Sequence, residues 1–137
     1  MNSQQILIHD VLIDHPVKVF FQANIIKCLA GQARFTFKLR DEFSGRDFES
    51  AGILGLVVDY VARALGNTCL EHCFLLEQEI RFYSHKLKSS LMVNASIESL
   101  NDTDAAFYCE IFSVEKSKNR IIAESRGTLW TSRCVSL

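Results

Sequence analysis

The stretch Ser50–Gly66, SAGILGLVVDYVARALG, predicts a helix that is apolar around nearly its whole circumference. Such a helix has to be enclosed by other elements rather than laid on a surface. Its two charged residues, Asp59 and Arg63, are four positions apart and share one face with Gly52 and Gly55. Glycine inside a helix costs about 1 kcal/mol relative to alanine, so we expect another backbone or a ligand to lie close to these glycines. Asp59 is therefore a candidate reactive carboxylate.

The composition of the chain is that of one folded domain spanning residues 1–137. Hydrophobic residues make up 48% of the 137 residues, enough for a single core. The net charge of −1, without a run of like charges, argues against nucleic acid as a partner. No apolar run approaches the roughly 18 residues of a membrane span, and no signal-peptide pattern opens the chain. Five irregularly spaced cysteines predict reduced thiols, so we expect a cytoplasmic protein.

Around the central helix, the sequence predicts an N-terminal helix and several strands. Residues 16–30 have helical periodicity, with Pro16 in the first turn and Gly31 as a stop signal. Alternating or apolar patterns predict strands at 33–40, 74–83, 90–100, 105–114 and 121–131. The strand at 105–114 is apolar on both faces and is expected to be central. The predicted fold class is α+β, with an antiparallel sheet curled around one long helix at residues 50–65.

This arrangement resembles the hotdog fold, and the helix is similar to that of the phenylacetyl-CoA thioesterase group of hotdog acyl-CoA thioesterases. That group opens the helix with His-Gly-Gly and carries an acidic residue nine positions after the His. Here Ser50, Ala51 and Gly52 stand at the motif positions, and Asp59 stands at the acidic position. The run NRIIAESRGTLW at 119–130 also resembles the last strand of that family.

The resemblance implies both domain limits and an assembly. Residues 33–131 would form the hotdog core, and residues 1–32 would form an N-terminal helical extension. Two protomers would join their sheets into a homodimer, or further into a dimer of dimers, with active sites at the interface. Unpaired edge strands favour such an assembly independently, because proteins usually cover them.

The resemblance also implies an activity, the hydrolysis of an acyl-CoA or acyl-carrier-protein thioester. Coenzyme A would be part of the substrate, and no separate cofactor is expected. Asp59 would act as nucleophile or general base, and the N–H of Ala51, beside Gly52, would polarise the thioester carbonyl. The free N–H groups and the dipole of a helix start favour developing negative charge in any case. Burial in an apolar helix is expected to raise the pKa of Asp59.

Two departures from the family pattern bear on this mechanism. Ser50 replaces the His of the motif and can instead cap the helix. Many members also supply a hydroxyl from the partner subunit, and the corresponding position falls near Leu75, with Glu77, Gln78 and Cys73 as open alternatives. The candidate substrate-binding residues are Ser50, Arg63, Gln78, His85 and Lys86. The last two follow the second strand of the core, where the family often meets the CoA nucleotide; solvated strand-end charges are the alternative.

Other interpretations stay open at this level. Asp59 and Arg63 could form a simple salt bridge between positions i and i+4. Cys69, His72 and Cys73 lie close together but lack a second ligand pair, so no metal site is predicted. His9 and His15 are interpreted as structural or exposed.

Two other function classes compete with thioester hydrolysis. A hotdog protein that binds an acyl thioester without turnover would explain the missing His and hydroxyl. A hydratase or dehydratase is the third class, because FSGRDFESAGIL at 43–54 is similar to a loop of the acyl-carrier-protein dehydratases. Those enzymes need a His in that loop, and the corresponding place here is near Glu42.

Overall fold

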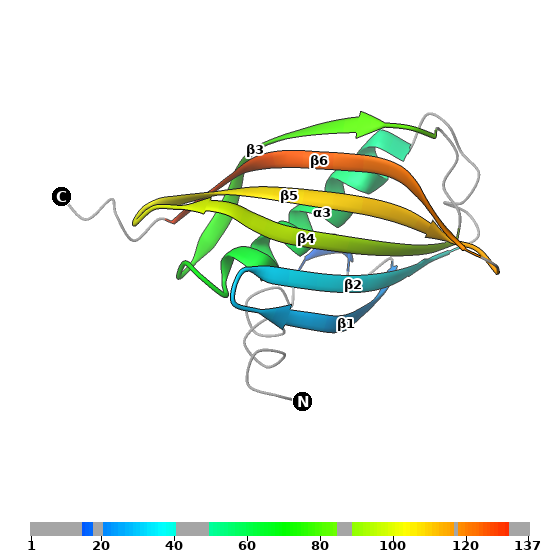
Figure 1. The fold of residues 1–137 in the computed structure, drawn as a ribbon, viewed down its shortest axis with the longest axis horizontal. Helices are drawn as coiled ribbons and strands as arrows, with labels where there is room; N and C mark the ends of the chain where they lie inside the picture. The colour runs from blue at the N-terminus through cyan, green and yellow to red at the C-terminus, as the bar shows by residue number, and fades with distance from the viewer. Residues whose placement is uncertain (1–14, 18–20, 41–49, 85–88, 117, 132–137) are drawn as a thin grey trace.

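A computed structural model describes residues 15–17, 21–40, 50–84, 89–116 and 118–131. Six strands form one antiparallel sheet in the order β1-β2-β4-β5-β6-β3, and the helix α3 lies across one face of it (Figure 1). The elements are β1 (Phe21–Leu29), β2 (Gln32–Leu39), α3 (Ser50–Gly66), β3 (Cys73–Phe82), β4 (Ser90–Leu100), β5 (Asp104–Val114) and β6 (Asn119–Thr131). No helix among these residues has the length and apolar character needed to cross a membrane.

The core lies between α3 and the inner face of the curled sheet. From α3 it takes Leu54 and Tyr60, and from the strands it takes Phe35 and Phe107, all fully buried. Each such side chain stabilises the fold by about 1.5–3 kcal/mol relative to exposure. The predicted central helix and the five predicted strands are confirmed to within two residues at their ends. The strand predicted at 105–114 is central as expected, because β5 pairs with β4 on one side and β6 on the other.

The helix predicted at residues 16–30 is wrong over its described length from Phe21 to Leu29, which forms β1. This strand pairs with β2 and therefore belongs to the sheet and not to a helical extension. A β-bulge between Ile25 and Lys27 explains the error. The inward positions are Phe21, Ala23 and Ile25 and then Cys28, so the bulge interrupts the strict alternation of a strand after Ile25.

The Gly31 stop signal is the second residue of a hairpin turn. Ala30 and Gly31 join β1 to β2, and both have positive φ, 43° and 82°. Two consecutive residues with positive φ are the signature of a type I′ turn, which matches the twist of an antiparallel hairpin. Glycine at the second position is therefore explained by the turn.

Gly127 on β6 provides a test of how closely β6 packs against its neighbours. A Cβ added there would overlap the Glu77 carbonyl oxygen of β3 and lie 2.7 Å from the ring of Phe107. Since a backbone carbonyl cannot move away easily, Gly127→Ala should lower the free energy of unfolding by about 2 kcal/mol or more. Urea unfolding would measure this loss.

The matched control for that variant is Gly52→Ala. No atom of the described residues lies within 4 Å of a Cβ added at Gly52. Removing this helix glycine should therefore leave stability unchanged or raise it by up to about 1 kcal/mol. Equal effects of the two alanines would contradict the close approach at Gly127.

Candidate active site

One stripe of α3 stays open to solvent while the rest of the helix is enclosed. From Gly52 to Gly66, the residues that keep some exposure are Gly52, Gly55, Leu56, Asp59 and Arg63. Their spacing of three or four positions places them on one face. The apolar helix predicted from sequence is thus enclosed except along the stripe that carries its two charges. We call these five residues the open stripe.

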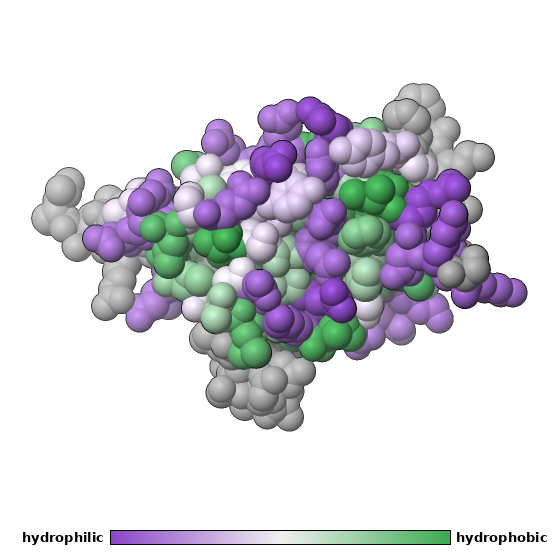
Figure 2. Space-filling view, viewed as in Figure 1, coloured by the Kyte–Doolittle hydropathy of each residue, from purple (hydrophilic) through white to green (hydrophobic). Residues whose placement is uncertain are grey.

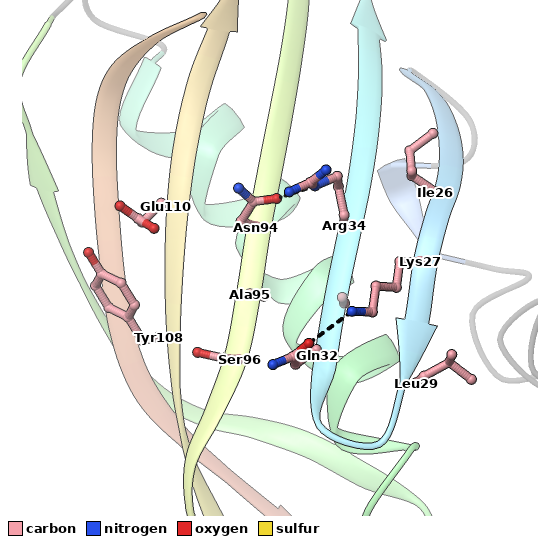
Figure 3. Close-up of a pocket in the computed structure, with 11 residues that line it drawn as sticks. Ile26, Lys27, Leu29, Gln32, Arg34, Asn94, Ala95, Ser96, Tyr108 and Glu110 are labelled. Atoms are coloured by element: carbon pink, nitrogen blue, oxygen red, sulfur yellow. Dashed lines mark hydrogen bonds between the residues drawn. The ribbon is translucent and has the colours of Figure 1, made fainter.

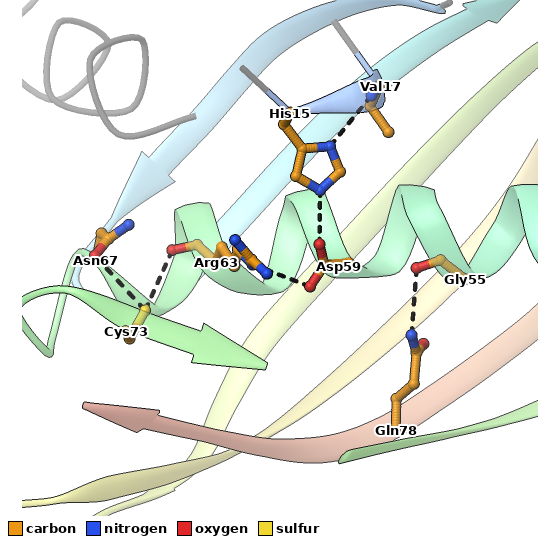
Figure 4. A network of polar contacts seen from close by, with 8 residues as sticks. All are labelled: His15, Val17, Gly55, Asp59, Arg63, Asn67, Cys73 and Gln78. Carbon is orange, nitrogen blue, oxygen red and sulfur yellow. Dashed lines mark hydrogen bonds and ion pairs between the residues drawn. The ribbon is translucent and has the colours of Figure 1, made fainter. Parts of the chain in front are cut away.

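The Asp59 carboxylate is held at both of its oxygens (Figure 4). Oδ2 lies 2.7 Å from Nε2 of His15, and Oδ1 accepts a hydrogen bond of 3.1 Å from Nε of Arg63. The i,i+4 pair of Asp59 and Arg63 considered from sequence is therefore present. It is not the whole of the interaction, because His15 supplies a second partner.

The pKa of Asp59 is lowered, opposite to the direction expected from sequence. Burial alone raises this pKa, but the hydrogen bond from His15 and the charge and hydrogen bond of Arg63 outweigh it. Hydrogen bonds and opposite charges favour the ionised form of a carboxyl group. Asp59 is therefore a carboxylate under ordinary conditions. The prediction failed because it counted desolvation by the helix and left out a donor from elsewhere in the chain.

His15 is the site residue that sequence reasoning missed. Its side chain is only 4% exposed, and its ring packs edge-on against Tyr60 at 5.3 Å between centroids. It reaches Asp59 across 44 positions of sequence. Nothing in the spacing of either residue indicates such a contact. The only signal was a histidine in the N-terminal segment, interpreted there as structural or exposed.

Gln78 connects the edge strand β3 to the open stripe. Its Nε2 donates to the backbone carbonyl of Gly55 at 3.3 Å. Its Oε1 is buried and has no hydrogen-bond partner among the described residues. A buried acceptor without a partner is uncommon. Gln78 is thus the polar side chain of β3 that lies next to the stripe, as its place among the candidate binding residues requires.

The other candidates for the missing hydroxyl are placed less favourably. Leu75 is partly buried against the core, and Glu77 is exposed and accepts from Thr128 at 3.2 Å. Cys73 is a buried free thiol that donates to the carbonyl of Arg63, and burial raises its pKa to about 11. A thiol with so high a pKa is a poor nucleophile.

The motif positions Ser50 and Ala51 form the first turn of α3, where backbone N–H groups lack partners within the helix. Gly52 opens the stripe, and the space above it is free of described atoms within 4 Å of an added Cβ. The close approach expected at the helix glycines is therefore not found at Gly52 among the described residues, and at Gly55 an added Cβ would meet only Nε2 of Gln78, at 3.8 Å. His9, Glu42, His85 and Lys86 lie outside the described residues.

Within the part of the chain that the structure describes, no three His, Cys, Asp or Glu side chains gather into a group that could hold a metal ion. Cys69, His72 and Cys73, which lie close together in the sequence, are not brought into such a group. Cys69 instead lies 3.4 Å from the hydroxyl of Thr68, and Cys73 bonds to the end of α3.

The outer face of the sheet carries a separate groove. Hydrophilic side chains dominate this face, with hydrophobic ones between them (Figure 2). A groove of about 570 Å³ lies over β1, β2 and β4, lined by polar side chains such as Arg34 and Asn94 and by the exposed Leu29 (Figure 3). The sheet separates this groove from α3, so it is not part of the site around Asp59.

No family model matches the sequence, and no curated protein matches it. Solved structures do match the fold. A thioesterase family protein from Silicibacter pomeroyi gives a TM-score of 0.80 at 16% identity, covering 93% of this chain and 97% of its own. A hypothetical thioesterase from Streptococcus pneumoniae, solved with coenzyme A, gives 0.73 at 15% identity, covering 89% and 94%.

The PaaI protein from the phenylacetic acid degradation operon of Escherichia coli gives a TM-score of 0.70 at 16% identity, covering 95% of this chain and 99% of its own. These likenesses confirm the hotdog fold and its resemblance to thioesterase-family structures, including one from the expected group. At identities of 15–16%, these likenesses are evidence for the fold alone.

Proposed function

We propose that this protein is a thioesterase that hydrolyses an acyl-CoA or acyl-carrier-protein thioester. The observation that carries the proposal is the ionised Asp59 carboxylate on the open stripe of an otherwise enclosed helix. A carboxylate has about four acceptor positions, and His15 and Arg63 occupy two of them. Two positions therefore remain to receive a proton from water or to attack the thioester carbon.

The distance between the two catalytic elements argues for a site shared by two protomers. Ala51 and Asp59 are eight residues apart on α3, which is about 12 Å along the axis at 1.5 Å per residue. The carbonyl oxygen of the thioester has to accept from the Ala51 N–H while its carbon meets the Asp59 carboxylate. These two groups must therefore lie within about 6 Å of each other. The Ala51 N–H would therefore work with Asp59 of a second copy.

The edge strand β3 is the element through which we propose this pairing. It closes one side of the sheet and has no neighbouring strand beyond it among the residues that the structure describes. Leu76 on β3 is 59% exposed, and Gln78 connects this strand to the open stripe. Pairing here would cover an exposed edge and bring the two helices side by side. Sedimentation should then show a dimer or larger species, and a 15.6 kDa species alone at micromolar concentration would contradict it.

The substrate contacts follow from the same stripe. Gly52 gives the thioester room to approach the helix start, and Ser50 lies at that start. Arg63 contacts Asp59 from the same helix, and Gln78 of β3 contacts the carbonyl of Gly55 on the open stripe. Two solved structures with this fold are named as thioesterases, and one of them was solved with coenzyme A. Both names support a thioester substrate. On the family resemblance, His85 and Lys86 would contact the CoA nucleotide.

A second candidate function is the binding of an acyl thioester without turnover. The specific observation in its favour is that both oxygens of Asp59 already accept hydrogen bonds and its pKa is lowered. A carboxylate with a lowered pKa is a weaker base. The hydratase alternative keeps only its sequence argument, since the place near Glu42 lies outside the described residues.

One experiment separates these functions. A panel of acyl-CoAs of different chain length is assayed for release of free thiol, and the melting shift that each one causes is measured in parallel. Release together with a shift supports the thioesterase; a shift without release supports the binder. Hydration of an enoyl-CoA would support the third class.

A further inference from the structure

His15 makes the more restrictive of the two contacts to Asp59. The Arg63 side chain is 38% exposed, and solvent screens an exposed i,i+4 ion pair so that it restrains its partner only weakly. The His15 side chain is 4% exposed, and its bond to Asp59 is shorter, 2.7 Å against 3.1 Å. A buried, short hydrogen bond to a charged group restrains its partner more strongly than an exposed ion pair does.

The ring of His15 is itself fixed at its other nitrogen. The backbone N–H of Val17 donates to Nδ1 at 3.2 Å, so Nδ1 carries a lone pair. In the neutral ring the proton then sits on Nε2, directed at Oδ2 of Asp59. The ring also packs edge-on against the buried Tyr60, which restricts its rotation. The tautomer and the orientation are thus both set by the fold (Figure 4).

We propose that His15 is a positioning residue that holds the Asp59 carboxylate in one orientation for attack on the substrate. The catalytic consequence of this inference rests on the proposed function, whereas the contact between His15 and Asp59 does not depend on it. His15 fixes Oδ2 from inside the molecule, and Arg63 steadies Oδ1 from the solvent side. Holding both oxygens fixes the plane of the carboxylate on the open stripe. A reacting group misplaced by about 1 Å can cost about 100-fold in rate.

The test compares His15→Phe with His15→Gln in the full chain. Phe keeps a ring beside Tyr60 but has no N–H, whereas Gln can again donate to Asp59. We expect His15→Phe to lower kcat by about 10- to 100-fold with KM changed little, because His15 does not touch the substrate. His15→Gln should recover part of that loss. The control is His72→Asn at an exposed turn with positive φ, which Asn tolerates; its kcat should stay unchanged.

The pH profile supplies a readout that a merely structural role would not move. His15 and Arg63 are the groups that donate hydrogen bonds to Asp59, and the His15 bond lowers the pKa of Asp59. Removing that bond raises the pKa, so the acid limb of kcat/KM should move to higher pH in His15→Phe. A folded His15→Phe with wild-type kcat, or equal losses in both variants with an unmoved limb, would overturn the proposal.

A second measurement keeps the inference separate from the proposed function. The ¹³C resonance of the Asp59 carboxyl, assigned by its absence in Asp59→Asn, is titrated in wild type and variant. If wild type releases no thiol from any acyl-CoA, the proposed function fails, yet a higher midpoint in His15→Phe still supports the His15 contact. An identical midpoint would overturn it. Should His15→Phe not fold, His15→Leu, which also lacks a donor, takes its place: a midpoint above that of wild type supports the contact, and an identical midpoint overturns it.

Discussion

Asp59→Asn is expected to lower kcat for thioester hydrolysis by at least about 100-fold, the low end for general acid–base catalysis. Asn has nearly the shape of Asp but cannot accept a proton or attack a thioester effectively. Affinity for the acyl-CoA should change little, because the open stripe keeps its shape. Steady-state kinetics and a melting shift with a non-hydrolysable analogue would measure the two quantities separately.

The same variant should lose stability, since the carboxylate accepts from both His15 and Arg63. Replacing it with Asn removes the charge that both donors face, and we expect a loss of about 1–2 kcal/mol. The matched control is Asp104→Asn, where the carboxylate accepts from Asn101 at an exposed turn; kcat there should stay at the wild-type value. Equal hydrolysis by wild type and Asp59→Asn would refute a catalytic Asp59 and favour the binding function.

The central helix and five strands could be predicted because their patterns are local. An apolar helix bounded by glycine and strands of strict alternation are set by side-chain period alone. β1 could not be predicted in this way, because its bulge interrupts the alternation after Ile25. The bulge is visible only once β1 is paired with β2, and that pairing is a property of the tertiary structure.

The candidate site was predictable only in part, for a related reason. Asp59 and Arg63 stand on the same helix, so their contact follows from spacing. His15 comes from a segment 44 residues away, and only the fold brings it to Asp59. The direction of the pKa shift depended on this missing donor. A buried carboxyl group next to an apolar helix face therefore says little about its pKa until its hydrogen-bond donors are known.

The proposal that two protomers share the active site predicts a large effect at the start of α3. Ala51→Pro deletes the backbone N–H proposed to polarise the thioester, and proline is tolerated in the first turn of a helix. Losing one such donor costs about 10²–10³ in rate. Ala51→Pro and Asp59→Asn should each be nearly inactive alone. Unchanged hydrolysis by a folded Ala51→Pro would rule out this role of the helix start.

Mixing the two inactive variants then tests whether the site is shared. In a heterodimer, the intact Ala51 N–H of one protomer meets the intact Asp59 of the other, which restores one site of two. Co-refolding equal amounts should recover about a quarter of wild-type activity, because half the dimers are mixed. A double variant carrying both changes, co-refolded with wild type, should also give about a quarter if sites are shared but about half if each lies within one chain. If each site lay within one protomer, the first mixture could not recover activity. The two groups would then have to come from one helix, about 12 Å apart along its axis, and every chain in the mixture lacks one of them.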